Sequence, residues 1–144
     1  MQKNLDSSDP QIFLKDAYAE GVTLKLGDFL GAVLRPVVMF ESRGKLDSPR
    51  LHELLASNSS VALEAILTNR TDGAALLAIR VCMICCALLG EEVGVRRWAT
   101  EGATRCQAAD GVWARSLPEW NWVLENPARY IRHAVAIKHS FNQL

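Results

Sequence analysis

The sequence predicts an all-α protein, and three observations carry this prediction. First, the sixteen positions from Ala74 to Leu89 contain one charged residue, Arg80, and a helix that is apolar on every side has to be buried on every side. Second, three segments begin with a capping residue followed directly by proline, as helices often do. Third, no Asn-Gly hairpin turn competes with them. We expect a compact bundle of about six to eight helices around a buried central helix at about residues 73–89.

Length and composition are those of one globular domain. The chain has 144 residues, of which 49% are hydrophobic and 22% are charged. A chain of this size buries roughly two thirds of its unfolded surface, so no metal or disulfide is required to hold it together. We expect a single helical domain over residues 1–144, with residues 1–9 as a flexible N-terminus.

The first third of the chain predicts a helix and two further apolar segments. Asp9-Pro10 begins a helix at about residues 10–20, which Gly21 ends. The apolar segment 26–34 reaches Pro36, which ends or kinks it. Residues 37–40 are continuously apolar and fit either a helix past that kink or a short strand. Residues 41–47 form a loop.

Two helices are expected before the central one. Ser48 with Pro49 begins a short helix, and residues 58–60 (Asn-Ser-Ser) break it and cap the next. Residues 69–72 then turn the chain into the central helix. The expected core-facing residues of this pair are Leu51, Leu54, Leu55, Val61, Leu63, Ile66 and Leu67.

Three more helices follow the central one. Apolar residues, Trp98 among them, recur at helical spacing over residues 91–109, until Asp110-Gly111 breaks the pattern. Ser116 with Pro118 begins a short helix through residue 124, and Asn126-Pro127 begins the last helix. The apolar side of this last helix consists of Tyr130, Ile131, Ala134, Val135, Ile137 and Phe141.

Within the central helix, small and bulky side chains lie on different faces, so two neighbouring helices can pack against it. The small face consists of Ala74, Ala75, Ala78, Cys82, Cys85 and Cys86, and the bulky face of Leu77, Val81, Ile84 and Leu88. Zinc needs about four ligands converging from loops or turns, and a disulfide between adjacent turns of a helix would be strained. We therefore interpret the cysteines as packing residues and expect no metal and no cofactor.

Arg80 is the unusual residue of the central helix. In one interpretation its stem packs while its head reaches solvent or pairs with an acid of a neighbouring helix. In the other, it points into a groove and binds a phosphate or carboxylate of a ligand.

The charge balance and the N-terminus bear on partners and compartment. Lys and Arg together number 16, as do Asp and Glu, so the overall field does not attract polyanions. The polar N-terminal residues have no signal-peptide pattern, and the apolar run covers only about 24 Å of a ~30 Å bilayer core. We expect a cytoplasmic, intracellular protein without membrane association.

No familiar catalytic signature is present. His52, His133 and His139 are expected at the surface or at an interface, and the last two are six residues apart, which does not suit a metal pair. The glycines lack the context of a phosphate-binding loop. We therefore expect a protein that is not an enzyme, with a small enzyme assembled from scattered residues as the remaining class.

Tryptophan and arginine alternate through residues 96–132, and this region is the predicted interaction site. Trp98 belongs to the expected core, and Trp120 and Trp122 are two residues apart, so both cannot face inward on one helix. Trp and Arg are enriched in binding hot spots and also suit nucleic acid. The candidate interface residues are Arg96, Arg97, Arg105, Trp113, Arg115, Trp120, Trp122, Arg129 and Arg132.

The sequence thus predicts a non-enzymatic helical binding protein, a subunit or self-associating component of a larger assembly. Its expected partner is a protein or a second copy of the chain. The alternative is an accessory protein that binds the backbone of RNA or DNA through the same arginines, such as a small ribonucleoprotein subunit or a viral nucleic-acid-associated factor. Ordinary core and surface packing of the Trp and Arg residues is the third interpretation.

Overall fold

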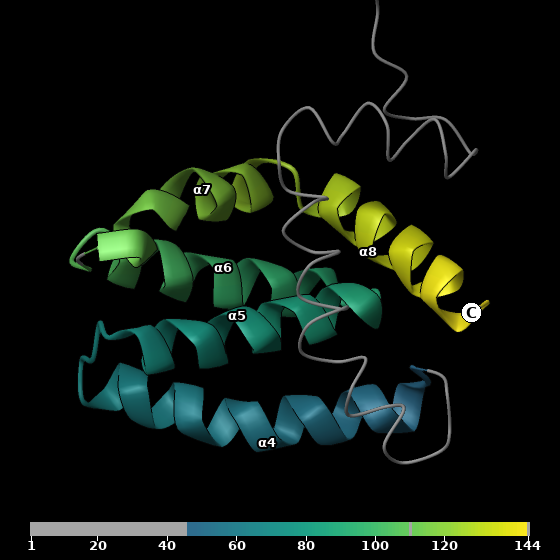
Figure 1. Cartoon of the computed structure of the whole chain (residues 1–144), viewed down its shortest axis with the longest axis horizontal. Helices are drawn as coiled ribbons and strands as arrows, with labels where there is room; N and C mark the ends of the chain where they lie inside the picture. The colour runs from purple at the N-terminus through teal and green to yellow at the C-terminus, as the bar shows by residue number, and fades with distance from the viewer. Residues whose placement is uncertain (1–45, 110, 144) are drawn as a thin grey trace, which may run out of the picture.

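The computed structural model describes residues 46–109 and 111–143. The expectations for residues 1–45 lie outside this part of the chain: the flexible N-terminus, the helix at 10–20, the segments 26–34 and 37–40, and most of the loop 41–47. The described residues form five α-helices, one 3-10 helix and no strand, which confirms the all-α prediction there (Figure 1). The elements are α4 (Ser48–Leu67), α5 (Gly73–Leu88), α6 (Glu92–Cys106), η2 (Gly111–Ser116), α7 (Leu117–Glu125) and α8 (Pro127–Asn142).

The helices pack in chain order. Figure 1 shows α4, α5, α6 and α7 side by side, with α8 inclined across one end of the row. Helix α5 contacts α4 on one side and α6 on the other, and it also contacts α8. Short connections between antiparallel neighbours produce this arrangement.

Helix α4 is continuous, so the predicted break at residues 58–60 is wrong. Asn58 donates from Nδ2 to the carbonyl of Leu54 at 2.9 Å, and the Ser59 hydroxyl donates to the carbonyl of Ala56 at 3.2 Å. These side chains bond to the preceding turn instead of capping a new helix, as such residues do when they lie inside a helix. The N-cap is Asp47, one residue before the expected Ser48, and its carboxylate accepts from Arg50 N at 3.0 Å.

The unbroken helix also changes which residues of α4 face the core. Leu51 is buried, and eleven residues is about three turns, so Ala62 has the same inward direction. The prediction that Val61, Leu63 and Leu67 face inward is wrong, because these side chains are 43%, 39% and 86% exposed.

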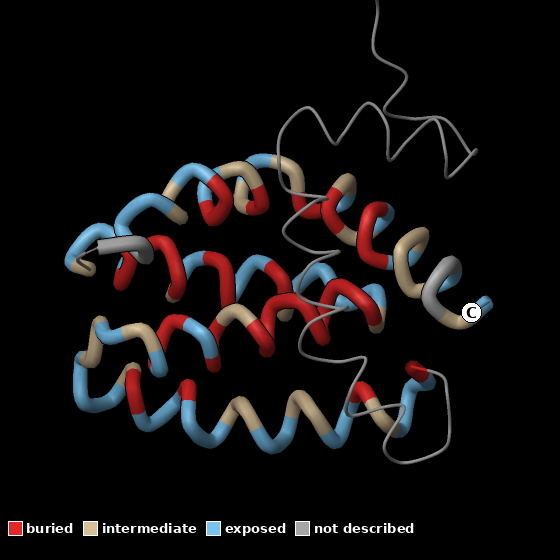
Figure 2. Tube along the Cα trace, viewed as in Figure 1, coloured by how far each residue is buried: buried red, intermediate tan, exposed pale blue. Residues whose placement is uncertain are grey.

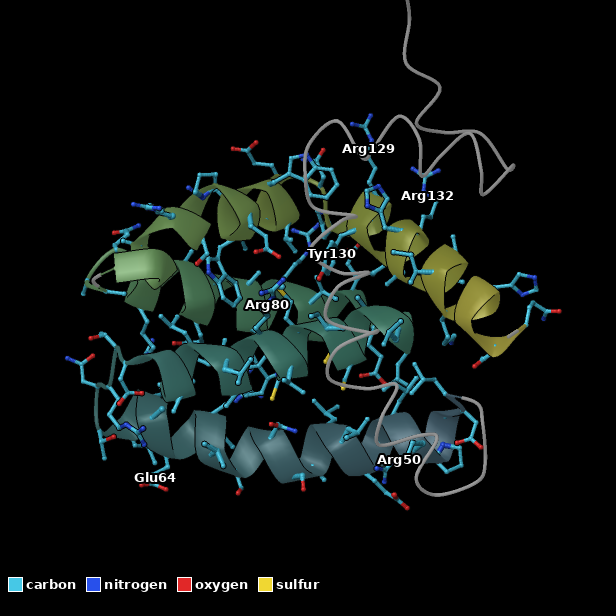
Figure 3. All side chains as sticks on the ribbon, in the orientation of Figure 1. Arg50, Glu64, Arg80, Arg129, Tyr130 and Arg132 are labelled. Atoms are coloured by element: carbon cyan, nitrogen blue, oxygen red, sulfur yellow. The ribbon has the colours of Figure 1, made fainter. Side chains whose placement is uncertain are left out.

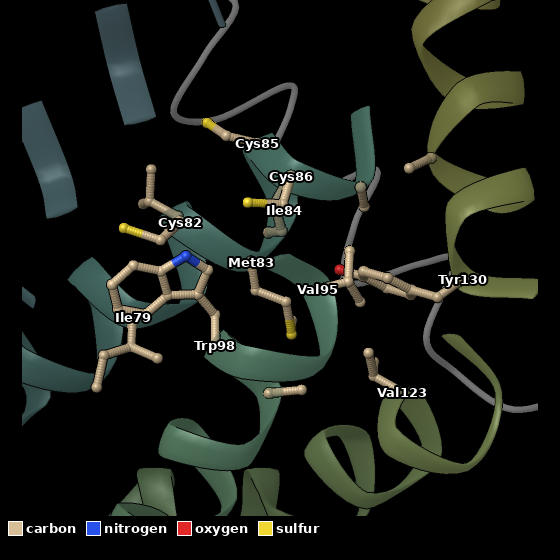
Figure 4. Packing of buried hydrophobic residues seen from close by; sticks show 14 of the residues in the cluster. Ile79, Cys82, Met83, Ile84, Cys85, Cys86, Val95, Trp98, Val123 and Tyr130 are labelled. Carbon is tan, nitrogen blue, oxygen red and sulfur yellow. The ribbon is translucent and has the colours of Figure 1, made fainter. Parts of the chain in front are cut away.

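Helix α5 begins and ends where the sequence predicts. The Asp72 carboxylate accepts from Ala75 N at 2.8 Å, and Gly90 has a φ of +76°, in the left-handed region that glycine adopts without strain. Twelve of its sixteen residues are buried (Figure 2), and Figure 4 shows several of them against α6, α7 and α8. Ala74 and Leu77, expected on packing faces, are exposed. No helix in the described part of the chain is long and apolar enough to cross a membrane.

Two glycines set the distance between α6 and its neighbours. A Cβ atom added at Gly94 would lie 2.6 Å from Cys86 Sγ on α5, and one added at Gly102 would overlap the Trp120 ring on α7. Both contacts are shorter than van der Waals packing allows. Glycine at these positions therefore permits the close approach of α6 to both helices.

Helix α8 is tied to the rest of the bundle by two polar contacts. Lys138 donates from Nζ to the carbonyl of Leu88 at 2.7 Å, which places a cation at the C-terminal end of α5. Asn142 accepts from Leu46 N at 2.8 Å and donates to Leu46 O at 3.4 Å. The start of the described chain is thus joined to the end of its last helix.

Candidate functional site

The predicted interface residues lie on several elements of the bundle. Helix α6 carries Arg96, Arg97 and Arg105, and η2 carries Trp113 and Arg115. Helix α7 carries Trp120 and Trp122, and α8 carries Arg129 and Arg132. The side chain of Trp113 lies outside the described part of the structure, and Arg115 is exposed.

Arg105 is a packing residue in this structure. It is 7% exposed, and its Nη1 donates to the Glu101 carboxylate at 2.6 Å. Its Nη2 donates to the carbonyl of Ile66, in the last turn of α4, at 3.3 Å. Because its charge is used to join α6 to the end of α4, Arg105 is not part of an accessible surface.

Arg96 and Arg97 are exposed at the start of α6 but have local partners. Arg96 Nε donates to the Glu92 carboxylate at 3.3 Å, with both side chains about half exposed. The guanidinium carbon of Arg97 lies 5.0 Å from the centroid of the Trp98 ring, a cation–π distance. Trp98 itself is 4% exposed, which confirms its place in the core, so Arg97 lies over a buried ring.

The two tryptophans of α7 have different environments. Trp120 is buried, its ring packs on Gly102, and its Nε1 donates to the Ser116 hydroxyl at 3.0 Å. Trp122 is half-buried, and its ring centroid lies 5.5 Å from that of His133 on α8. As their spacing predicts, one tryptophan faces inward and the other lies at the boundary of the core.

Trp122 contacts α8 at His133, and α8 carries two arginines and no acidic residue. Arg129 is half-buried and Arg132 is exposed, and Figure 3 shows both on the outer side of α8. We call Trp122, Arg129 and Arg132 the α7–α8 surface. It combines a partly exposed aromatic ring with guanidinium groups, the residue types that dominate binding hot spots.

His133 is fully buried where α8 meets Trp122 of α7, so of the two expected positions, surface or interface, the surface one is wrong for this residue. Burial lowers the pKa of His133 from 6.5 to about 4, and the nearby positive charge of Arg132 lowers it further. The imidazole is therefore neutral at physiological pH and packs against Trp122 as an aromatic ring. His52 and His139 are exposed.

Arg80 pairs with an acid of a neighbouring helix, as the first interpretation predicts. Its Nη2 donates to Glu119 on α7 at 3.2 Å, with the side chains 18% and 4% exposed. Tyr130 on α8 lies close enough to this pair for both charges to act on its hydroxyl, and Figure 3 shows it near Arg80. Burial raises the pKa of Tyr130 well above its usual range, the charge of Glu119 raises it further, and that of Arg80 opposes the shift. These residues connect α5, α7 and α8.

The cysteines are buried thiols. Burial raises the pKa of Cys82 and Cys85 to about 12 and that of Cys86 to about 11, so they stay protonated at neutral pH. A thiolate is the form that acts as a nucleophile or metal ligand. Among the described residues, no group of three or more histidine, cysteine or acidic side chains could hold a metal ion.

The sequence indicated part of this arrangement but not its centre. The single charge in the apolar run pointed to Arg80, whereas nothing in the sequence analysis singled out Glu119, an acid in the first turn of α7. Tyr130 and His133 lie three apart and so share the inward side of α8. A tyrosine and a histidine on an otherwise apolar helical side are the signal that could have identified the polar part of the interface between α7 and α8.

Comparison of the chain with protein-family models, curated proteins and solved structures finds no match.

Proposed function

We propose that this chain is a non-enzymatic binding protein, a subunit or self-associating component of a larger assembly, and that it contacts its partner through the α7–α8 surface. The observation that carries this proposal is the position of Trp122 on α7, half-buried against His133 of α8, since α8 also carries Arg129 and Arg132 and contains no acid. An aromatic ring fixed by a buried neighbour loses little conformational freedom on binding, which favours affinity.

The proposal extends to the fold of the whole chain. It places α5 as the central helix of a bundle of six to eight helices, with contributions from residues outside the described part. The burial of α5 against three described helices supports this arrangement. A cytoplasmic location is also proposed, and it is supported by four free cysteines, which are typical of reducing compartments.

A second candidate function is backbone binding to RNA or DNA. The absence of acids from α8 and the exposure of Arg96, Arg97, Arg115 and Arg132 favour it, because exposed arginines bind phosphate oxygens. We prefer a protein partner because Trp98 and Trp120 are buried and Trp122 packs against His133. These three rings do not form an open platform for stacked bases.

Site-specific photo-crosslinking tests the proposed function. Ala128 is exposed one residue before Arg129, and replacing it with p-benzoylphenylalanine puts a crosslinker on α8. We expect protein crosslinks in cells of the native source that survive nuclease treatment and are lost with Arg129→Ala/Arg132→Ala.

The matched control places the same crosslinker at Thr104, an exposed residue of α6. Equal crosslinking from both positions would contradict a binding site on α8. Crosslinks that disappear with nuclease would instead support the nucleic-acid function.

A further inference from the structure

Helix α4 presents an exposed outer face that no other described helix covers. Its positions recur every three or four residues, as one side of a helix does. We call this face the α4 stripe, and it consists of Glu53, Ala56, Ser57, Ser60, Leu63, Glu64 and Leu67. Figure 2 shows it as the exposed lower border of the bundle.

The α4 stripe combines apolar and acidic groups. Leu67 is 86% exposed and Leu63 is 39% exposed, and these two leucines lie one turn apart. Glu64 lies between them, and its charge acts on Arg70, while Glu53 pairs with Arg50 at 2.9 Å. An exposed leucine pair beside a carboxylate is suited to an apolar surface that carries positive charge.

Helix α8 offers such a surface on its own outer face. We call it the α8 stripe, and it consists of Ala128, Arg129, Arg132, Val135 and His139. Val135 was expected on the apolar side of this helix, but it is 42% exposed. It lies three residues after Arg132, so an apolar and a basic group are neighbours on one side of the helix. Helix α8 itself contains no aspartate or glutamate.

The two stripes are complementary in charge, and both contain exposed apolar side chains. Figure 3 shows Glu64 at one border of the bundle and Arg129 and Arg132 at the opposite border. The stripes of one molecule therefore cannot meet each other. They can meet only between molecules, and a contact between two different surfaces repeats head to tail.

We infer that a second copy of this chain is the partner, and that the α8 stripe of one copy docks on the α4 stripe of the next. This inference rests on the proposed function, because the α8 stripe shares Arg129 and Arg132 with the α7–α8 surface proposed there. Exposed ion pairs contribute to this contact, so it weakens as salt screens them. The exposed leucines contribute apolar burial to the binding free energy, and salt does not screen this contribution.

Sedimentation velocity over a concentration series tests the inference with the full chain. We expect the weight-average sedimentation coefficient to rise with concentration at about 50 mM salt and to rise less at about 500 mM. Arg129→Glu/Arg132→Glu on α8 and Glu53→Arg/Glu64→Arg on α4 should each raise the dissociation constant at least about tenfold. Leu67→Ser should weaken association at both salt concentrations, since it removes an apolar contact.

Mixing the two charge-reversed chains gives the sharpest result. In the mixture, the α8 stripe of the first variant, now acidic, can dock on the α4 stripe of the second variant, now basic. The unchanged α8 stripe of the second variant can dock on the unchanged α4 stripe of the first. The equimolar mixture should therefore recover the association that each variant has lost alone. Circular dichroism confirms that the variants are folded. Arg115→Glu, an exposed reversal outside both stripes, is the matched control and should leave association unchanged.

Three outcomes would overturn the inference: a monomer at every concentration and salt, a mixture that stays monomeric, or an equal effect of Arg115→Glu. The crosslinker at Ala128 separates this failure from failure of the proposed function. A monomer whose Ala128 position still captures a different protein retains the proposed function with another partner. A monomer without such crosslinks contradicts both.

Discussion

Acidification should destabilise this bundle through His133. Its pKa is about 4 in the folded chain, against 6.5 when it is exposed, because the ring is buried and Arg132 is near. Between these two pH values the unfolded chain binds a proton that the folded chain does not bind. The free energy of unfolding therefore falls as the pH drops through this range.

The two pKa values determine the magnitude of the effect. The titration of His133 lowers the free energy of unfolding by about 2 kcal/mol at pH 5 and by about 3 kcal/mol below pH 4. Each tenfold difference in proton affinity between the unfolded and the folded chain corresponds to about 1.4 kcal/mol. A domain of this size has a total stability of roughly 5–15 kcal/mol, so a loss of this size is readily measured.

Urea unfolding at pH 7.5, 6 and 5 measures this contribution. His133→Phe keeps a ring against Trp122 but cannot titrate, so it should remove about 2 kcal/mol of the pH dependence whatever its stability at pH 7.5. His139→Phe changes an exposed histidine of the same helix and is the control. Equal pH dependence in the two variants would refute the reasoning.

The remaining predictions concern packing. Gly102→Ala should lower stability by about 1–3 kcal/mol in thermal unfolding, because the added methyl overlaps the Trp120 ring. In an exposed helix the same substitution usually raises stability by about 1 kcal/mol, and such a gain would contradict the contact. Arg80→Met should cost about 3 kcal/mol in urea unfolding because it removes the positive charge that pairs with the buried Glu119 carboxylate. Glu119→Leu in the same chain should recover most of this loss, and additive costs would argue against the pair. The four cysteines should react with a thiol reagent no faster than the chain opens, and rapid labelling of the folded chain would contradict their burial.

Helix boundaries were predictable where a local rule decided them. Asp72 caps the start of α5 and Gly90 adopts the left-handed conformation after its end, and both roles follow from the residue type. The same rules failed at Asn58 and Ser59, because their side chains can also bond to the preceding helical turn. Whether such a side chain caps a new helix or bonds to the preceding turn depends on how α4 packs against α5. The sequence of α4 alone does not determine that packing.

The candidate site was less predictable than the fold. The Trp and Arg composition indicated the region but could not separate exposed from buried members. Arg105 is buried because its charge is used at the end of α4, 39 residues away in sequence, and Arg80 meets Glu119 across the same separation. Such long-range pairs follow from tertiary packing, and neither helix shows them alone.

The contact between Leu46 and Asn142 has a consequence for the order of folding. The two residues are 96 positions apart in the chain. At about 5–20 residues per second, the ribosome adds Asn142 roughly 5–20 s after Leu46, whereas helices form within about a microsecond. Helices α4 to α7 therefore have time to pack in sequence before α8 is complete. The contact that joins both ends of the described bundle forms last, and until then the α5 surface that α8 covers is exposed to chaperones and to other chains.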